Sequence, residues 1–135
     1  MGDMDGKVAL VTAASRGLGR ATALALARRG ARVAICSRDP AAAASAASAI
    51  AKDTGAETWG SAVDVSKRDE VSKFVGDVAS HFGGVDVLVS NAGGPPAGDF
   101  GAFEDSEWER AFALIVMSAI RLVREVLPHM CRRGG

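Results

Sequence analysis

The segment from Lys7 to Arg38 constrains the fold of this chain more than any other. It opens with a short apolar run, Val8 to Val11, of the kind that lies buried on both faces of a parallel sheet. Gly17 and Gly19 then introduce an Ala/Leu-rich stretch with the composition of a helix. A second apolar run follows at Ala31 to Ser37. This succession predicts a strand, a glycine turn, a helix and a second strand of one parallel sheet.

The glycine turn points to a particular use of this unit. The first backbone N–H groups of a helix have no partner within the helix and carry partial positive charge. A pyrophosphate can bind there if no side chain blocks its approach, and Gly17 and Gly19 remove that obstruction. Glycines also occur in turns that only need a positive φ, so the two glycines alone leave both interpretations open.

The residues from Thr12 to Gly19, TAASRGLG, resemble the TGxxxGxG turn of the short-chain dehydrogenase/reductase family. Ala13 stands where the family usually has its first glycine. If this position needs a positive φ, the methyl group adds strain of roughly 1–2 kcal/mol, which the binding energy of a ligand can offset. The resemblance implies that the turn holds a dinucleotide through Ala13, Ser15, Arg16, Gly17, Leu18 and Gly19.

The end of the second predicted strand bears on the choice of cofactor. NAD-specific members of the family place an acidic residue there to bind the ribose 2′-hydroxyl, whereas this chain has Ser37 followed by Arg38. Arg38 and Arg16 resemble the basic pair that binds the 2′-phosphate in NADP-dependent members, because a guanidinium matches the geometry of a phosphate. The alternative is that both arginines are solvated surface charges. We expect NADP(H) as the preferred cofactor, with NAD(H) as the substitute.

Asp64 and Val65 follow a third predicted strand, 57–63, and resemble the Asp-Val pair of the family. In the resembling proteins the carboxylate accepts a hydrogen bond from the adenine amino group. An aspartate after a strand is also a common helix cap. Ser66 and Asp69 have the spacing of a capping box, so we expect Ser66 to cap the next helix and to leave Asp64 free for a ligand.

A fourth predicted strand, 85–90, leads into Asn91, Ala92 and Gly93, which match the NAG signature of the family. The resemblance implies that this loop stabilises the sheet and faces the ribose on the nicotinamide side. Glycine and proline punctuate the following residues, 93–98, which therefore cannot continue a regular element. We expect this segment either as a loop over the cofactor cleft or as a plain link to the next helix.

The four strands alternate with predicted helices, without repeats or linkers. The strands are expected near 7–12, 32–37, 57–63 and 85–90, and the helices near 17–29, 40–53, 67–82 and 106–130. Right-handed crossovers then give the strand order 3-2-1-4 in a Rossmann-type, doubly wound parallel sheet. We expect residues 1–135 to form a single but incomplete NAD(P)-binding domain, which stops where the family's fifth strand is about to begin.

The composition limits the classes of molecule that this chain is expected to bind. Sixteen basic and sixteen acidic residues leave no net charge, which argues against nucleic acid and against an anionic membrane surface. Cys36 and Cys131 lack metal-site or redox-motif spacing, so we expect free thiols in the cytoplasm and no metal site. The apolar, uncharged run 111–120 is too short to cross a bilayer and is expected to be a buried or interface helix.

The usual catalytic residues of the family are not found. The resemblance implies a serine and a Tyr-x-x-x-Lys pair beyond strand 4, but the chain contains no tyrosine, and Ile115 falls where a relay asparagine is expected. The family's activity, hydride transfer between NADP(H) and a carbonyl or alcohol substrate, would therefore need residues outside this chain. The nearest likeness is to 3-oxoacyl-carrier-protein reductases. The alternatives are a non-catalytic dinucleotide-binding or sensor module, and an oligomerisation fragment that no longer binds cofactor.

The predicted helix 106–130 carries a broad apolar stripe, which in the resembling family packs against its copy in a neighbouring subunit. The stripe consists of Phe112, Ile115, Val116, Ala119, Leu122, Val123 and Val126. Strand 85–89 would also be the edge of the sheet and expose unpaired backbone groups. We therefore expect a homo-oligomer formed through this helix.

Overall fold

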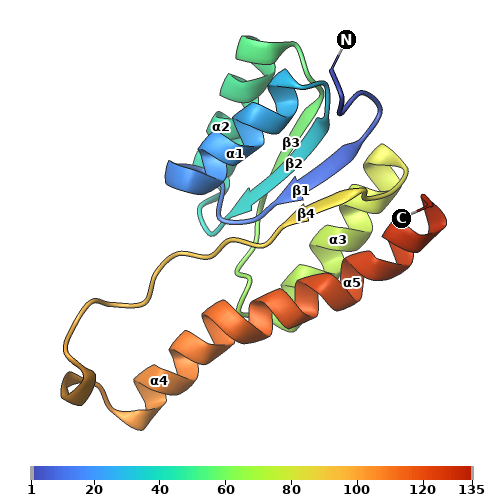
Figure 1. The fold of residues 1–135 in the computed structure, drawn as a ribbon. Coiled ribbons are helices and arrows are strands. Elements are labelled where there is room, and N and C mark those ends of the chain that lie inside the picture. Colours follow the sequence, from blue (N-terminus) through green and yellow to red (C-terminus); the bar gives the residue numbers. More distant parts are fainter. Residues whose placement is uncertain (1, 135) are drawn as a thin grey trace.

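The sheet of this protein is parallel and has the strand order β3-β2-β1-β4, as the sequence predicts. A computed structural model describes residues 2–134. The strands are β1 (Val8–Val11), β2 (Arg32–Ser37), β3 (Thr58–Ala62) and β4 (Val87–Val89). Within the described residues β4 is hydrogen-bonded only to β1, so it forms one edge of the sheet (Figure 1).

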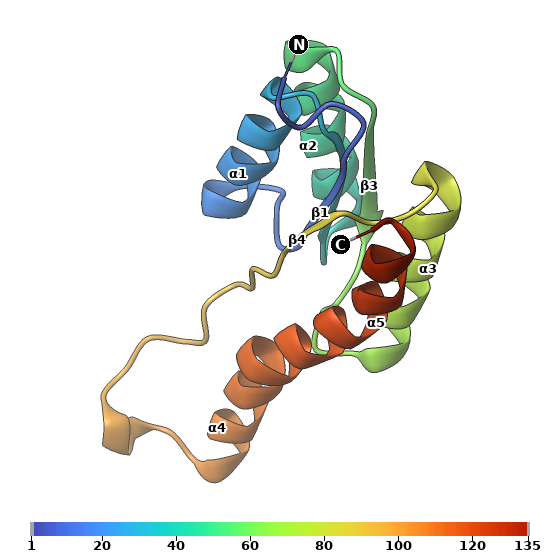
Figure 2. The ribbon, with the colours of Figure 1, turned by 45° about the vertical axis from the view of Figure 1, so that its right-hand side comes forward.

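Helices cover both faces of the sheet. Helices α1 (Gly17–Arg28) and α2 (Pro40–Thr54) lie on one face. Helices α3 (Arg68–Phe82) and α5 (Ser118–Arg132) lie on the other (Figures 1 and 2). The doubly wound arrangement expected from the alternating strands and helices is therefore confirmed.

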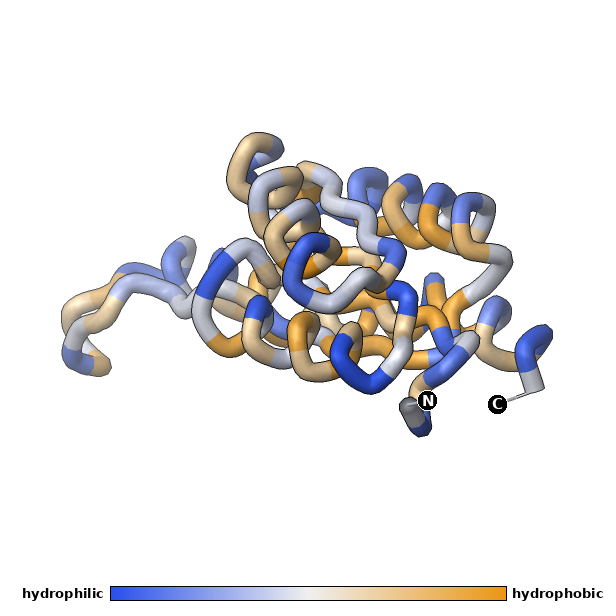
Figure 3. The backbone as a smooth tube through the Cα atoms, turned by 90° about the horizontal axis from the view of Figure 1, so that it is seen from above, coloured by the Kyte–Doolittle hydropathy of each residue, from blue (hydrophilic) through white to orange (hydrophobic). Residues whose placement is uncertain are grey.

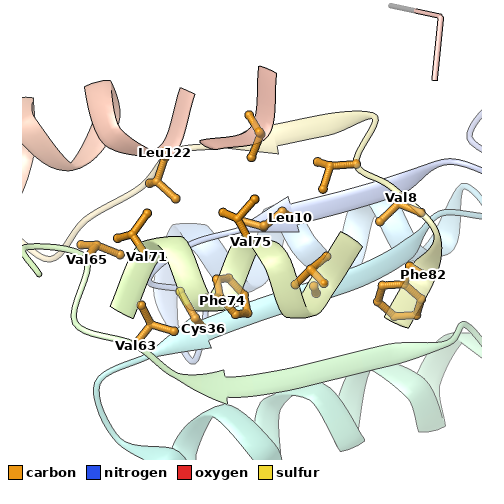
Figure 4. Packing of buried hydrophobic residues seen from close by; sticks show 14 residues of the cluster. Val8, Leu10, Cys36, Val63, Val65, Val71, Phe74, Val75, Phe82 and Leu122 are labelled. Atoms are coloured by element: carbon orange, nitrogen blue, oxygen red, sulfur yellow. The ribbon is translucent and has the colours of Figure 1, made fainter. Parts of the chain in front are cut away.

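The alternation of side chains along β1 divides the core into two clusters. Val8 and Leu10 pack with α3 and α5, whereas Ala9 and Val11 pack with α1 and α2. The α3 contribution to the first cluster is the apolar face that its sequence spacing predicts (Figure 4). Figure 3 shows the hydrophobic residues concentrated between the layers, with hydrophilic residues at the outer turns.

Helix α2 lies close to the sheet because its side chains are small. It begins after Asp39, whose carboxylate accepts a hydrogen bond from the N–H of Ala41 at 2.9 Å, and it ends at Gly55 with φ 75°. A Cβ atom at Gly60 of β3 would lie 2.4 Å from the carbonyl oxygen of Ala43. Gly60 and the alanine and serine residues of α2 thus allow a backbone approach that larger side chains would prevent.

The segment after β4 does not close over the sheet. Residues 93–98 are exposed, and Figures 1 and 2 show that the chain runs away from the sheet toward a short helical turn, η1 (Phe100–Ala102). The expectation of a loop over the cleft is therefore wrong, and the alternative of a plain link to the next helix describes the segment.

The long helix differs from the sequence prediction in its start and its interior. It begins at Asp105, one residue before the predicted start at 106, because Glu104 caps it and the Glu107 carboxylate accepts a hydrogen bond from the N–H of Glu104 at 2.8 Å. Its path comprises α4 (Asp105–Phe112), a π-helical turn η2 (Ala113–Met117) and α5. A π turn inserts an extra residue and changes which side chains share a face.

The apolar stripe of this helix is divided between two faces. Leu122 and Val126 are buried against α3 and the sheet, so they are not available to a partner. The exposed apolar residues are Trp108, Phe112, Ile115, Val116, Ile120, Val123 and Leu127. The expectation of one broad stripe is therefore corrected. Residues 111–120, expected to form a buried or an interface helix, do not form a buried one.

An ion pair fastens the C-terminal end of α5 to the strands. Asp86, whose side chain is 4% exposed, accepts hydrogen bonds from Arg133 at 2.8 and 3.1 Å and from the N–H of Val8 at 2.8 Å. Arg133 also donates to the carbonyl oxygen of Gly6 at 3.0 Å. These bonds hold the pKa of Asp86 below its usual value, chiefly through the hydrogen bond from Arg133.

Candidate functional site

The turn after β1 contains a residue in a strained conformation. Ala13 has φ 49°, in the left-handed region that favours glycine. The sequence-based expectation of a methyl group at a glycine-like position is thus met. Backbone hydrogen bonds hold the residues on both sides of Ala13. The N–H of Thr12 donates to the carbonyl oxygen of Val89 at 3.1 Å, and the N–H of Ala14 donates to the carbonyl oxygen of Cys36 at 3.0 Å.

The two glycines of the turn are needed for different reasons. Gly17 has φ 60°, and a Cβ atom built on it would meet no atom of residues 2–134 within 4 Å. A Cβ atom at Gly19 would lie 2.4 Å from the carbonyl oxygen of Ala13 and 2.8 Å from Nδ2 of Asn91. Gly17 therefore gives the turn its conformation, whereas Gly19 allows the start of the helix to approach the strands.

Asn91 joins the end of β4 to this turn. The Thr12 hydroxyl donates to the carbonyl oxygen of Asn91 at 2.5 Å and accepts a hydrogen bond from its N–H at 2.8 Å. The Asn91 side chain donates to the carbonyl oxygen of Ala13 at 3.2 Å. Thr12, fully buried, is a residue that the sequence analysis missed, because a threonine at the end of an apolar run looks like an ordinary strand residue.

The N-terminus of α1 is open to an anion. Arg16 precedes the helix with an extended backbone, φ −158°, and in the described part of the chain no side chain caps this end. The first turn contains no acidic residue among those described, and Leu18 is 80% exposed. The free N–H groups and the positive end of the helix dipole therefore face outward without a competing side chain.

Two arginines lie in the loops that follow β1 and β2. Arg16 and Arg38 are both exposed, and the Ser37 hydroxyl donates to the carbonyl oxygen of Asp39 at 2.9 Å. Ser37 at the end of β2 pairs with Ala62 at the end of β3, which brings Arg38 to the same end of the sheet as the loop that contains Asp64. The structure thus brings the two basic positions and Asp64 to one end of the sheet.

The interaction between Asp64 and Ser66 differs from the prediction. Ser66 does not cap α3; instead its N–H and its hydroxyl both donate to Oδ1 of Asp64, at 3.0 and 2.6 Å. Helix α3 begins at Arg68, after Lys67. The hydroxyl hydrogen bond is the main cause of the lowered pKa of Asp64. Asp64 is therefore held in a fixed orientation as a carboxylate, rather than left free.

The remaining predicted site residues differ in exposure. The Val65 side chain is 7% exposed and belongs to the core, so only its backbone can face a ligand. Ala92 is half-buried, and Gly93 lies where the exposed segment begins. Burial raises the pKa of the Cys36 thiol to about 12, so this cysteine stays protonated and unreactive.

Residues 2–134 contain no cluster of histidine, cysteine and acidic side chains suited to a metal ion. The helices of this range are also too short or too polar to span a membrane.

A family model described as short chain dehydrogenase matches residues 7–135. The chain belongs to this family. It is 36% identical over 127 residues to the 3-oxoacyl-(acyl-carrier-protein) reductase FabG of Staphylococcus epidermidis, an alignment that covers 94% of this chain and 52% of that protein. It is also 36% identical to a versicolorin reductase of Emericella nidulans, over 98% of this chain and 50% of that protein. The chain spans about half the length of the curated relatives it matches.

Solved structures of the family match the fold closely. The L-sorbose reductase of Gluconobacter frateurii, solved with NADPH and L-sorbose, gives a TM-score of 0.92 at 37% identity and covers 97% of this chain and 50% of that one. An alcohol dehydrogenase of Thermococcus sibiricus, solved with 5-hydroxy-NADP, gives a TM-score of 0.89 at 33% identity. That match covers 96% of this chain and 55% of the other. The arrangement of sheet and helices described above is thus that of the corresponding half of these family members.

Proposed function

We propose that this chain binds NADP(H) as the cofactor half of a short-chain dehydrogenase that interconverts carbonyl and alcohol groups. The observation that carries the proposal is the N-terminus of α1, which among the described residues has no side-chain cap and no acidic residue in its first turn. Gly17 leaves open space beside it. A helix end prepared in this way accommodates the pyrophosphate of a dinucleotide.

Each part of the cofactor has a group suited to it. Backbone N–H groups of the turn from Ala13 to Gly19 would bind the pyrophosphate, and Asp64 would accept a hydrogen bond from the adenine amino group. The loop Asn91, Ala92 and Gly93 would lie along the ribose on the nicotinamide side. When bound, the cofactor supplies or accepts a hydride.

The charges at the end of β2 favour the phosphorylated cofactor. An acidic residue there would repel a 2′-phosphate, but the chain has Ser37 followed by the exposed Arg38. Arg38 and Arg16 can both donate charge-assisted hydrogen bonds to a phosphate. This arrangement supports a preference for NADP(H) over NAD(H), as does the presence of NADPH and an NADP derivative in the two structures named above.

The reaction itself needs groups that this chain does not contain. The chain has no tyrosine to exchange a proton with a substrate oxygen, and Ile115 at the expected relay position cannot carry a proton. We therefore propose that residues 1–135 form one cofactor-binding unit that binds without turnover. The alternative, a non-catalytic sensor module, uses the same binding site. A cytoplasmic location accords with the two free thiols.

Thermal unfolding and turnover assays on the purified chain test this proposal together. A ligand that binds only the folded state stabilises it by about 2.7 kcal/mol at a hundredfold excess over Kd, so NADPH should raise the Tm by several degrees. Oxidation of NADPH with a panel of ketones should stay at background. A Tm unaffected by NADPH overturns the binding proposal, whereas turnover that survives repurification overturns the claim of inactivity.

We further propose that the chain forms a homodimer through the exposed face of the α4–η2–α5 helix, defined here as the dimer face. The dimer face comprises Trp108, Phe112, Ile115, Val116, Ile120, Val123 and Leu127. Its side chains are 40–53% exposed, although residues of this type are usually buried. A dimer with two such helices in contact could bury about 800 Å² per partner, which is ordinary for a stable interface.

The spacing of these residues favours an antiparallel pair related by a two-fold axis. Trp108 and Leu127 lie at equal distances along the sequence from the boundary between Met117 and Ser118, and Phe112 and Val123 do so as well. A two-fold axis at this boundary would place Trp108 of one copy against Leu127 of the other, and Phe112 of one copy against Val123 of the other.

The charges of the helix agree with this orientation. The start of α4 is acidic, with Glu104, Asp105, Glu107 and Glu109, whereas the end of α5 carries Arg132. An antiparallel pair brings the acidic end of one copy beside the basic end of the other, whereas a parallel pair would bring like charges together.

A further inference from the structure

Helix α5 contacts the loop between β3 and α3 through a charged side chain. Nη1 of Arg121 donates a hydrogen bond to the backbone carbonyl oxygen of Ser66 at 2.9 Å. The two residues are 55 positions apart in the sequence, so only the packing of α5 on α3 brings them together. Among residues 2–134, no hydrogen bond joins the Arg121 side chain to the glycine turn.

The next residue along α5 anchors the same loop by apolar packing. Leu122, 1% exposed, and Val65, 7% exposed, belong to one core cluster. Figure 4 shows Val65, Val71 and Leu122 at the same end of this cluster. Leu122 therefore fixes the depth of the loop, and Arg121 fixes the direction of the peptide group between Ser66 and Lys67.

The position of Ser66 determines the orientation of Asp64. Both hydrogen bonds from Ser66, at 3.0 and 2.6 Å, go to Oδ1 of Asp64, and the N–H of Asp64 donates to Glu70 at 2.6 Å. A shift of the Ser66 backbone would move the donor that holds Oδ1. The Asp64 carboxylate is thus connected to α5 through Ser66, by hydrogen bonds that are all within normal length.

We propose that Arg121 is a positioning residue for the adenine end of the cofactor site. This inference rests on the proposed function, because it assumes that Asp64 binds the adenine. Arg121 donates to the Ser66 carbonyl, and the N–H and hydroxyl of Ser66 hold Oδ1 of Asp64. Oδ2 would then remain to accept a hydrogen bond from the adenine amino group of a bound cofactor. Loss of Arg121 weakens cofactor binding through Asp64, without any contact between Arg121 and the cofactor.

A double-mutant cycle distinguishes this role from a general contribution to stability. The Kd of NADPH is measured by calorimetric titration for the wild type, Arg121→Ala, Asp64→Ala and the double variant. Loss of one hydrogen bond should weaken NADPH binding by about three- to tenfold in Arg121→Ala. Since the effect passes through Asp64, Arg121→Ala should change the Kd less than twofold when Asp64 is already alanine.

Two further variants complete the design. Arg124→Ala removes the same charge from an exposed position of the same helix and should leave the Kd unchanged. Arg121→Lys keeps a donor but loses the planar guanidinium, so its Kd should lie between those of the wild type and Arg121→Ala. If Arg121→Ala does not fold, Arg121→Lys takes its place in the cycle.

The outcomes separate the two proposals. A wild-type chain that does not bind NADPH overturns the proposed function and this inference with it. Wild-type binding with an unchanged Kd for Arg121→Ala, or with penalties that add fully in the double variant, overturns the positioning role alone. An equal loss in Arg124→Ala would assign the effect to the net charge of α5 and would also overturn it.

Discussion

The side-chain amide of Asn91 donates a hydrogen bond at 3.2 Å to the carbonyl oxygen of Ala13, a residue that has φ 49°. The loop after β4 therefore holds the strained residue of the glycine turn in place. A Cβ atom at Gly19 would approach both of the bonded atoms, the Ala13 oxygen at 2.4 Å and Nδ2 of Asn91 at 2.8 Å. The glycine turn and the loop after β4, two separate parts of the sequence, thus depend on one another at the site.

The strain at Ala13 predicts the effect of two substitutions. Ala13→Gly relieves strain of about 1–2 kcal/mol but increases the entropy of the unfolded chain, so we expect a net gain in unfolding free energy of up to about 1 kcal/mol. Ala13→Val should lower the stability by more than 1 kcal/mol, about the cost of placing a β-branched residue in this region. Urea denaturation measures both values. A loss of stability in Ala13→Gly would mean that the turn is not strained at this residue.

The Asp86–Arg133 ion pair predicts an acid-sensitive attachment of α5. Because the pKa of Asp86 is lowered in the folded state, its contribution to stability is fully present above about pH 5. That contribution is lost as the pH falls through the unfolded value of about 3.9 toward the folded pKa. Asp86→Asn should cost about 2 kcal/mol at pH 7 and should reduce the slope of stability against pH in the acid range.

The control for Asp86 is another aspartate in an ion pair. Asp53 pairs with Arg28 at 2.8 Å, but both side chains are more than half exposed. Asp53→Asn should cost less than about 1 kcal/mol, because the ion pair is exposed to solvent. Denaturation at several pH values compares the variants, and equal effects of the two substitutions would contradict the role assigned to Asp86.

The dimer face predicts the oligomeric state. Ile120 lies near the proposed two-fold axis, so Ile120→Asp would place two carboxylates close together and should give a monomer. Lys52→Ala, on the exposed side of α2, changes the net charge by the same amount and should leave the dimer intact. Light scattering at tens of micromolar measures both masses. A wild-type chain that is monodisperse as a monomer would exclude the proposed dimer.

The sequence was most informative where one local rule decides the structure. Asp39 and Gly55 mark the two ends of α2, and the apolar spacing of α3 identifies the face that it buries. The order of the strands follows from the handedness of parallel connections. The glycine turn was also predictable, including the position of Ala13, because only a few residue types suit its backbone.

The parts that sequence reasoning missed depend on contacts between distant segments. The spacing of Ser66 and Asp69 indicates a capping box, but the Ser66 hydroxyl donates to Asp64 instead. Arg121 donates a hydrogen bond to the carbonyl oxygen of Ser66. The π turn between α4 and α5 has no sequence signal of its own, so the expected stripe included Leu122, which faces the core. The role of the buried Thr12 depends on the pairing of β4 with β1, which brings the backbone of Asn91 within hydrogen-bond distance of the Thr12 hydroxyl.

Titration of the wild-type chain and Arg38→Asp with NADPH and NADH tests the central claim most directly. The account predicts that the wild type binds NADPH ten- to a hundredfold more tightly than NADH, about the value of one bidentate phosphate contact. In Arg38→Asp the order should reverse, because an aspartate repels the 2′-phosphate and can bind the 2′-hydroxyl. Equal affinities of the wild type for the two cofactors, or a preference for NADH, would contradict the account.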